Sequence, residues 1–193
     1  RMREQAFLNA GLRIRTVDLR PGREQSDEMC YEGGIREFVA YLNTDKDVLH
    51  QNIIYMAGTR DTSMAEVALQ YNDGYSETIL SFANNIHTPE GGMHEEGFKK
   101  ALTRVLNKYG QKMEILKNDE KVSGDDCREG LTCVISVKLT EAQFEGQTKA
   151  KLGNSEVRTL VDNLVSEKLE IFLEENPAVG RTILDKAMTA SRA

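Results

Sequence analysis

The chain has 193 residues, of which 39% are hydrophobic and 29% are charged. This composition is typical of a folded globular protein and argues against a disordered chain, and the length fits one large domain. The sequence has no apolar run of about 18 residues and no signal peptide, so it predicts neither a membrane span nor a secreted protein. The first residue is Arg1, which indicates a piece of a longer protein.

The net charge is −6, from 25 basic and 31 acidic residues, which argues against binding of nucleic acid over the whole surface. Residues 99–117 are the exception, because they carry six basic side chains and one acid. This run is either a solvated helix face or a local contact with a polyanion. The three cysteines show no paired spacing and predict reduced thiols in a cytoplasmic protein; they are Cys30, Cys127 and Cys133.

The first part of the chain predicts short elements separated by turns. Residues 2–9 have the pattern of a helix end, residues 12–19 of a strand and residues 32–43 of a short amphipathic helix. The polar segment 20–28 is expected to form a hairpin tip or a mobile loop, because it contains the turn signal Pro21-Gly22.

Three strands are expected next. They cover residues 53–56, 65–71 and 76–84, and the last two flank the turn signal Asn72-Asp73-Gly74. This arrangement predicts that residues 65–71 and 76–84 pair as an antiparallel hairpin.

The second half predicts longer elements. Apolar residues recur at helical spacing over 98–109, and alternate at strand spacing over 131–139. Between them, residues 110–123 are expected to be a polar connector, and Ser123 with Asp126 forms a capping box for one helical turn. Two further helices are expected over 155–175 and 178–191. The whole pattern predicts the α+β class, with a mostly antiparallel sheet and helices on one face.

The loop that contains Gln147, Thr148 and Lys149 is the strongest candidate for a binding site. Gln147 supplies amide donors and Lys149 supplies a compact positive charge, both suited to phosphate. Gly146 and Gly153 make the backbone permissive, and the start of the following helix adds a favourable dipole. A plain surface loop with a solvated lysine is the alternative interpretation.

Other polar clusters predict structural roles. Gly91-Gly92 before a helix fits a turn and matches no nucleotide-binding motif. The histidines have no metal-ligand spacing; they are His50, His87 and His94. Asp125, Asp126 and Glu129 suggest magnesium, but helix capping explains Asp126 more simply. The chain contains no recognisable catalytic constellation.

An ordered series of motifs runs along the chain. The series is Tyr31-Glu32-Gly33-Gly34-Ile35, Gln70-Tyr71-Asn72-Asp73-Gly74-Tyr75, Ala83-Asn84-Asn85-Ile86, Gly91-Gly92 with His94-Glu95, Gly124-Asp125-Asp126 with Arg128-Glu129-Gly130-Leu131, Gln143 to Lys149, Lys151-Leu152-Gly153 with Ser155-Glu156-Val157, and Glu175-Asn176-Pro177. This series resembles the transducer region of the ATPase subunit of type IIA DNA topoisomerases, the family of DNA gyrase B and its topoisomerase IV counterpart. The resemblance covers essentially the whole chain. We favour the gyrase type, because Phe144-Glu145-Gly146 runs directly into the Gln-Thr-Lys loop.

The resemblance implies a fold like the second domain of ribosomal protein S5, with a left-handed βαβ crossover that breaks the usual handedness. It implies a transducer core over residues 1–153 and long C-terminal helices of the same domain over 154–193. In the family, a preceding GHKL-type domain binds ATP and Mg²⁺ and carries the catalytic carboxylate. Those motifs are absent from these residues, so the chain by itself is expected to be inactive.

By resemblance, Gln147 and Lys149 match the pair that reaches the γ-phosphate of ATP in the neighbouring domain. This makes Lys149 a candidate catalytic residue as well as a binding residue. Lys99, with Lys100 and Arg104, matches the basic helix that faces the cavity for transported DNA. One departure is Met93, where the family commonly has Thr; since Thr is a good N-cap, capping of that helix must come from elsewhere.

The expected partners are the preceding ATPase domain, a second copy of the same protein, gyrase A and duplex DNA. Two alternatives remain open: a non-catalytic module whose basic helix binds duplex DNA, and a ribosomal-type RNA-binding domain of the same fold. Aromatic residues make up 6% of the chain, which argues against the RNA-binding alternative.

Overall fold

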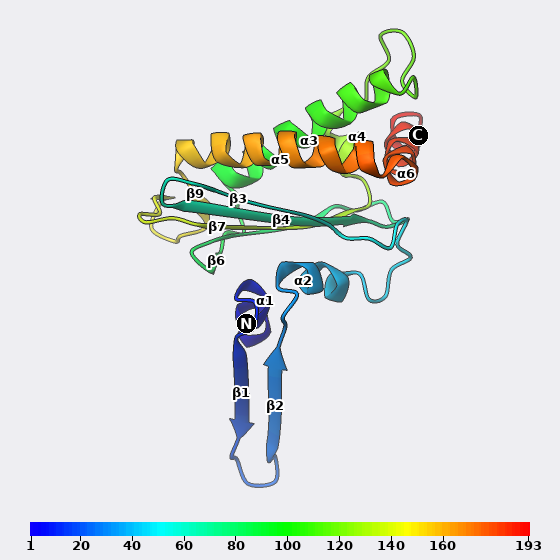
Figure 1. Ribbon diagram of the computed structural model, residues 1–193. Helices are drawn as coiled ribbons and strands as arrows, with labels where there is room; N and C mark the ends of the chain where they lie inside the picture. Colours follow the sequence, from blue (N-terminus) through cyan, green and yellow to red (C-terminus); the bar gives the residue numbers. More distant parts are fainter.

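The computed structural model describes residues 1–193 and is built around one five-stranded sheet (Figure 1). The strand order is β3-β4-β7-β5-β6, and every neighbouring pair is antiparallel except β5 and β7, which are parallel. The expected α+β class with a mostly antiparallel sheet is confirmed. The bounds are β3 (Ile54–Arg60), β4 (Ser63–Tyr71), β5 (Thr78–Ala83), β6 (Ile86–His87) and β7 (Leu131–Lys138).

The predicted hairpin between residues 65–71 and 76–84 is wrong, because β7 lies between β4 and β5. The turn is held open by the segment that enters β7: the Asn72 amide donates to the Gly130 carbonyl, and the Gly130 amide donates to the Ser76 carbonyl. A side chain at Gly130 would overlap the Asn72 carbonyl. The strong local turn signal therefore marks the place where β7, from much later in the chain, is inserted between β4 and β5.

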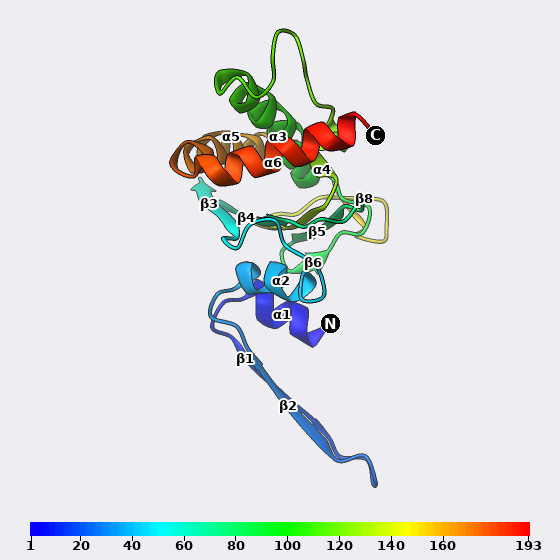
Figure 2. The ribbon, with the colours of Figure 1, turned by 90° about the vertical axis from the view of Figure 1, so that its right-hand side faces the viewer.

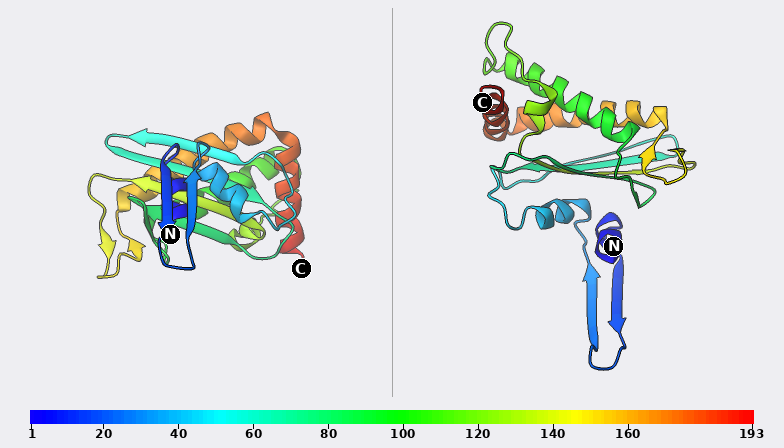
Figure 3. Two further views of the ribbon diagram at one scale, coloured as in Figure 1. Left: turned by 90° about the horizontal axis from the view of Figure 1, so that it is seen from below. Right: turned by 180° about the vertical axis from the view of Figure 1, so that it is seen from behind.

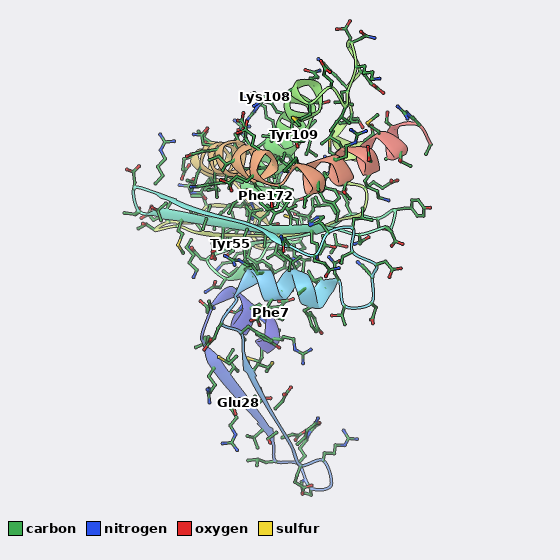
Figure 4. The ribbon with its side chains drawn as sticks, turned by 45° about the vertical axis from the view of Figure 1, so that its right-hand side comes forward. Phe7, Glu28, Tyr55, Lys108, Tyr109 and Phe172 are labelled. Carbon is green, nitrogen blue, oxygen red and sulfur yellow. The ribbon has the colours of Figure 1, made fainter.

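Helices cover both faces of the sheet (Figure 2), so the expectation of helices on one face is wrong. Four of them lie on one face, and α1 and α2 pack on the other because their buried residues Phe7 and Phe38 meet Val134 of β7 there. Figure 4 labels Phe7 on that side and Tyr109 and Phe172 on the side of the larger helices. The bounds are α1 (Met2–Leu8), α2 (Ile35–Leu42), α3 (Met93–Lys112), α4 (Gly124–Arg128), α5 (Ser155–Glu175) and α6 (Pro177–Ser191).

The helices follow the sequence patterns closely. The predicted capping box is present: the Ser123 hydroxyl accepts from the Asp126 amide at 3.1 Å, and the Asp126 carboxylate accepts from the Ser123 amide at 3.0 Å. The connector over 110–123 is less polar than expected, because α3 continues to Lys112 and three apolar side chains behind it are buried: Ile115, Leu116 and Val122. None of the helices combines the length and apolarity needed to cross a bilayer.

Two small antiparallel hairpins complete the fold. β1 (Arg13–Asp18) and β2 (Gln25–Cys30) project away from the sheet beside α1 (Figures 1 and 2). Residues 25–28, expected in the loop, are therefore part of a strand. β8 (Phe144–Glu145) and β9 (Lys151–Leu152) form the second hairpin, at the end of the molecule where α5 begins (Figure 3).

Candidate functional site

The Gln-Thr-Lys loop is the five-residue connection between β8 and β9 (residues 146–150). Its tip, which we define as Gln147, Thr148 and Lys149, is exposed. No hydrogen bond or ion pair involves the side chain of Gln147 or Lys149, so their donors face solvent. The two limbs below the tip are joined by the β8–β9 pairing and by an ion pair of 3.1 Å between Lys151 and Glu145.

The backbone of the tip is unusual for its residue types. Gly146 has φ +77° and Lys149 has φ +53°. The left-handed region costs a residue with a Cβ about 1–2 kcal/mol relative to the right-handed region. Such a conformation at a lysine persists only where the surrounding structure fixes it, and it is often found at binding sites.

The loop base anchors the loop to the rest of the fold. It consists of Gly91, Gly92, Leu152 and Asn154. The Leu152 amide donates to the Gly91 carbonyl at 3.0 Å, and Gly92 forms a parallel bridge with Leu152. Gly92 has φ +130°, and a Cβ there would overlap the backbone of Leu152. The Gly-Gly pair is therefore a turn, as predicted, and it also lets the chain before α3 lie directly against β9.

Asn154 closes the other side of the loop base. Its side chain is buried; its Oδ1 accepts from the Gln143 amide at 2.6 Å, and its Nδ2 donates to the Glu141 carbonyl at 3.0 Å. The same Nδ2 donates to the Glu156 carboxylate at 2.8 Å, and Asn154 is the residue before the first turn of α5. One amide side chain thus joins both limbs of the loop to α5.

His94 lies behind the loop base and is fully buried. Its Nε2 is 3.1 Å from the Thr88 hydroxyl, and the Thr88 carbonyl accepts from the Gly91 amide at 2.9 Å. Burial lowers the pKa of His94 to about 4. The neutral ring is therefore a structural part of the turn.

The helix that follows has no side-chain N-cap. Two carboxylates in its first turn, Glu95 and Glu96, complement the helix dipole instead. Glu95 also accepts from the Ser81 hydroxyl at 3.0 Å and pairs with Lys99 at 3.0 Å. The missing threonine at Met93 is thus offset by charge rather than by another cap.

The basic run of α3 faces an acidic side of α5. Arg104 pairs with Asp162 and also donates to the Ser166 hydroxyl, and the guanidinium holds the pKa of Asp162 below its usual range. Two further rungs follow: Lys108 with Glu170 at 3.0 Å, and Lys112 with Glu174 at 2.6 Å. We call these three pairs the ion-pair ladder. It explains both the basic run and the acidic helix face as largely structural.

The three residues assigned to DNA by resemblance differ in how free they are. Lys99 is paired with Glu95 and Arg104 is in the ladder, whereas Lys100 is exposed and forms no ion pair. The other candidates remain apart: the histidines do not cluster, and no group of three or more His, Cys, Asp or Glu side chains is arranged to hold a metal ion.

Sequence reasoning missed Asn154 and the function of Gly92. A signal for Asn154 was present, since Asn before a helix is a good cap residue. Both residues act through contacts with residues that are not their neighbours in the sequence: Gly92 contacts Leu152, and Asn154 contacts Glu141 and Gln143.

Comparisons with known proteins agree with one another. The family model described as DNA gyrase B matches residues 34–193. The DNA gyrase B protein of Clostridium acetobutylicum is 56% identical over 195 residues, which cover 100% of this chain and 30% of that protein. The chain therefore spans about a third of the length of the curated relatives it matches.

Two solved structures give the same result for the fold. The 43K ATPase domain of Thermus thermophilus gyrase B, in complex with an aminocoumarin, matches with a TM-score of 0.88 and 37% identity, over 98% of this chain and 50% of that one. The topoisomerase IV ATP-binding domain of Francisella tularensis, in complex with a small-molecule inhibitor, matches with a TM-score of 0.83 and 26% identity, over 99% and 51%. On the family model and the whole-chain identity, this chain belongs to the DNA gyrase B family.

Proposed function

We propose that the chain is the transducer domain of a bacterial, ATP-hydrolysing type IIA DNA topoisomerase of the gyrase type. In this proposal the core over 1–153 and the long helices over 154–193 act as one unit. The tip of the Gln-Thr-Lys loop contacts the γ-phosphate of ATP bound mainly by a preceding domain, and the nucleotide state is relayed to DNA strand passage.

One observation carries the proposal: an exposed tip with two unpartnered donors stands on a rigid base. Lys149 offers an ammonium and Gln147 an amide, with Lys149 held at φ +53°. Charge-assisted hydrogen bonds to phosphate are stronger than neutral ones. The paired base holds the backbone of the loop, so the tip presents both donors together at one end of the molecule.

The donors at the tip fit a phosphate better than Mg²⁺, because the tip has an ammonium and an amide but no carboxylate, the ligand that usually holds Mg²⁺. Mg²⁺ and most of the ATP contacts are assigned to the preceding domain. Bound ATP would supply a terminal phosphate whose negative charge is redistributed during transfer. Lys149 stabilises that charge, and Gln147 fixes the orientation of the loop.

Relay requires that the contact differ between nucleotide states, because a ligand shifts an equilibrium only by its differential affinity. Loss of the γ-phosphate removes the partner of Lys149. The loop base is joined to α3 through Gly92 and to α5 through Asn154, so a change in the tip is passed to both helices. Rotation of this domain against the ATPase domain is the expected consequence.

The test measures ATP turnover by the full-length protein. Lys149→Ala should lower turnover about 10²–10³-fold, by analogy with loss of one transition-state donor. Lys151→Ala is the matched control, because Lys151 carries the same charge two residues away and is paired with Glu145. A Lys149→Ala rate within twofold of the wild type would remove the contact from the mechanism.

The remaining expectations are part of the same proposal. A second copy of the same protein, gyrase A and duplex DNA are the proposed partners, in the cytoplasm. We favour gyrase over topoisomerase IV because the DNA gyrase B family model matches residues 34–193 and the gyrase B protein of Clostridium acetobutylicum is 56% identical to this chain. The two are distinguished by supercoiling of relaxed DNA by the assembled enzyme, which gyrase alone is expected to perform.

A second candidate function is binding of duplex DNA without a part in catalysis. It is favoured by the exposed and unpaired Lys100 on α3. Lys99 and Arg104 are assigned to the same surface, although their charges are compensated. DNA binding by the full-length protein should weaken steeply with salt. Binding that is absent, or insensitive to salt, would leave only the nucleotide-sensing role.

A further inference from the structure

A polar pocket lies between the N-terminal halves of α3 and α5, at the end of the ion-pair ladder that Arg104 and Asp162 form. Its volume is about 480 Å³, and none of the residues that line it is hydrophobic. α3 contributes two cations and α5 contributes one cation, one carboxylate and two neutral side chains. The lining residues are Lys100, Arg104, Arg158, Thr159, Asp162 and Asn163.

The charge of this pocket is not balanced, in contrast to the ladder. Three cations face one carboxylate, and Asp162 is already engaged by Arg104. Lys100 forms no ion pair, and Arg158 forms a long ion pair of 3.9 Å with Glu96, in which both side chains are about half exposed. The residues that line the pocket therefore carry an excess of two positive charges, which Glu96 at its edge offsets in part, on a chain whose net charge is −6.

The backbone below the pocket is fixed. A Cβ at Gly97 of α3 would overlap the Arg158 carbonyl of α5, so the two helices touch there without a side chain between them. Val157 and Leu160 anchor the same turn of α5 in the core. The helices that carry Lys100 and Arg158 are thus held at a constant separation, which reduces the entropy lost on binding.

We propose that this pocket binds one phosphodiester group of duplex nucleic acid, with Arg158 and Lys100 as its charge partners and Thr159 and Asn163 as neutral donors. The guanidinium of Arg158 offers the forked donor geometry that suits phosphate oxygens. The inference rests on the proposed contact with DNA and deepens it. It moves the centre of that contact from the α3 face to the α3–α5 junction, and it adds three residues of α5.

A phosphodiester fits better than a carboxylate of a protein partner. The entire lining is polar, the donors come from two helices, and no apolar rim is present to bury a side chain. The net acidity of the rest of the chain repels a polyanion elsewhere. Binding is therefore expected to be local and strongly dependent on salt.

In the experiment, fluorescence anisotropy measures binding of a labelled duplex, roughly 30 base pairs long, to the full-length protein over a range of sodium chloride concentrations. Each phosphate contact contributes about 0.9 to the slope of log K against log salt. Because both side chains bind the same phosphate, Arg158→Ala and Lys100→Ala should each reduce the slope by at most about 0.9, which is a loss of affinity of up to roughly eightfold at about 0.1 M salt. Thr159→Val and Asn163→Leu should weaken binding without changing the slope.

Lys112→Ala is the matched control. It removes the same charge from α3, but Lys112 is in the ladder, paired with Glu174. Its slope should stay close to that of the wild type. If Arg158→Ala and Lys112→Ala have equal effects, the pocket is not a site, and only the overall charge matters.

Two further outcomes separate the possible failures. If Lys99→Ala changes the slope and Arg158→Ala does not, DNA binding stands and the pocket is wrong. If no variant changes the slope, the DNA role itself fails, whereas the ATP turnover of Lys149→Ala still tests the sensor independently.

A last experiment adds sodium sulfate at matched ionic strength and measures whether sulfate competes with the duplex. If Arg158→Ala abolishes this competition without changing the salt slope of DNA binding, the pocket binds a free oxyanion, and the proposed nucleic-acid partner is wrong.

Discussion

The tip and the base of the Gln-Thr-Lys loop differ in every property that fixes a side chain. At the tip, the side chains of Gln147 and Lys149 are exposed and have no hydrogen-bond or ion-pair partner, and the backbone of Lys149 has φ +53°. At the base, Asn154 is buried with three hydrogen bonds, and Gly92 touches the backbone of Leu152. We therefore expect the base to contribute stability and, in the proposed function, the tip to contribute recognition. The two roles should therefore be separable by mutation.

The largest effect on stability is expected at Gly92. Gly92→Ala adds a Cβ at φ +130° that overlaps the Leu152 backbone, and backbone on both sides leaves no soft neighbour to move. Strain and overpacking together should cost at least about 3 kcal/mol of unfolding free energy, measured by urea denaturation. Gly146→Ala is the control: its φ is also positive, but no atom lies near the added Cβ. It should cost about 1–2 kcal/mol, and an equal cost at both positions would show that the contact with β9 is unimportant.

The next effect is expected at Asn154. Asn154→Ala leaves the Gln143 amide and the Glu141 carbonyl without partners near a buried site, at a cost of about 1–3 kcal/mol. Thr148→Ala, at the exposed tip, should change stability by less than about 0.5 kcal/mol.

Asn154→Asp is a sharper variant, because it keeps the shape and the acceptor. It loses both donated bonds, and it places a carboxylate against the Glu141 carbonyl and the Glu156 carboxylate. Its cost should equal or exceed that of the alanine variant. A neutral Asn154→Asp would mean that the amide does not join the two limbs.

Features formed by neighbouring residues and features formed by residues far apart in the chain also differ in how far the sequence predicts them. α3, α5 and the Ser123 capping box follow from patterns within a few residues, and the structure confirms them. The pairing of β4 with β7 does not, because residue 67 meets residue 135, and a local turn signal at Asn72 favoured the wrong neighbour.

The candidate site shows the same division. Glycine and lysine types at 146–149 indicate a phosphate-binding loop without any structure. The loop base cannot be predicted from local sequence, because Gly92 and Leu152 are 60 positions apart. The ladder is equally non-local, since Arg104 and Asp162 are separated by 58 positions. A basic run read alone predicts a free positive face, whereas three of its six charges are paired with α5 across the fold and Lys99 is paired within α3.

The pH dependence of stability offers a milder test of the base. The pKa of His94 is lowered to about 4 in the folded chain, against about 6.5 when unfolded. Between these values the unfolded chain binds the proton and the folded chain does not, so stability falls as the pH drops from about 6.5 toward 4.

At about pH 5 the share of His94 in this loss should be about 2 kcal/mol relative to about pH 7.5. The pKa of His50 is also lowered by burial, so the wild type includes a second contribution. The measurement is therefore the difference between wild type and His94→Gln in urea unfolding at the two pH values. Identical pH dependence of the two proteins would contradict a buried neutral His94.

The smallest effect on stability is expected at Lys149, and it separates the tip from the base most directly. Lys149→Gly relieves the left-handed strain, about 1–2 kcal/mol, and adds about 0.5–1 kcal/mol of backbone entropy to the unfolded chain. The net change should be a stabilisation of no more than about 1.5 kcal/mol. The same substitution in the full-length protein removes the ammonium, so turnover should fall as far as in Lys149→Ala. If Lys149→Gly is no less stable than the wild type and nearly inactive, the strained backbone at Lys149 serves function and not stability. If Lys149→Gly instead destabilises the fold as much as Asn154→Ala, the tip belongs to the same structural unit as the base. The left-handed backbone of Lys149 would then be supported by contacts of its side chain, and would not be strained.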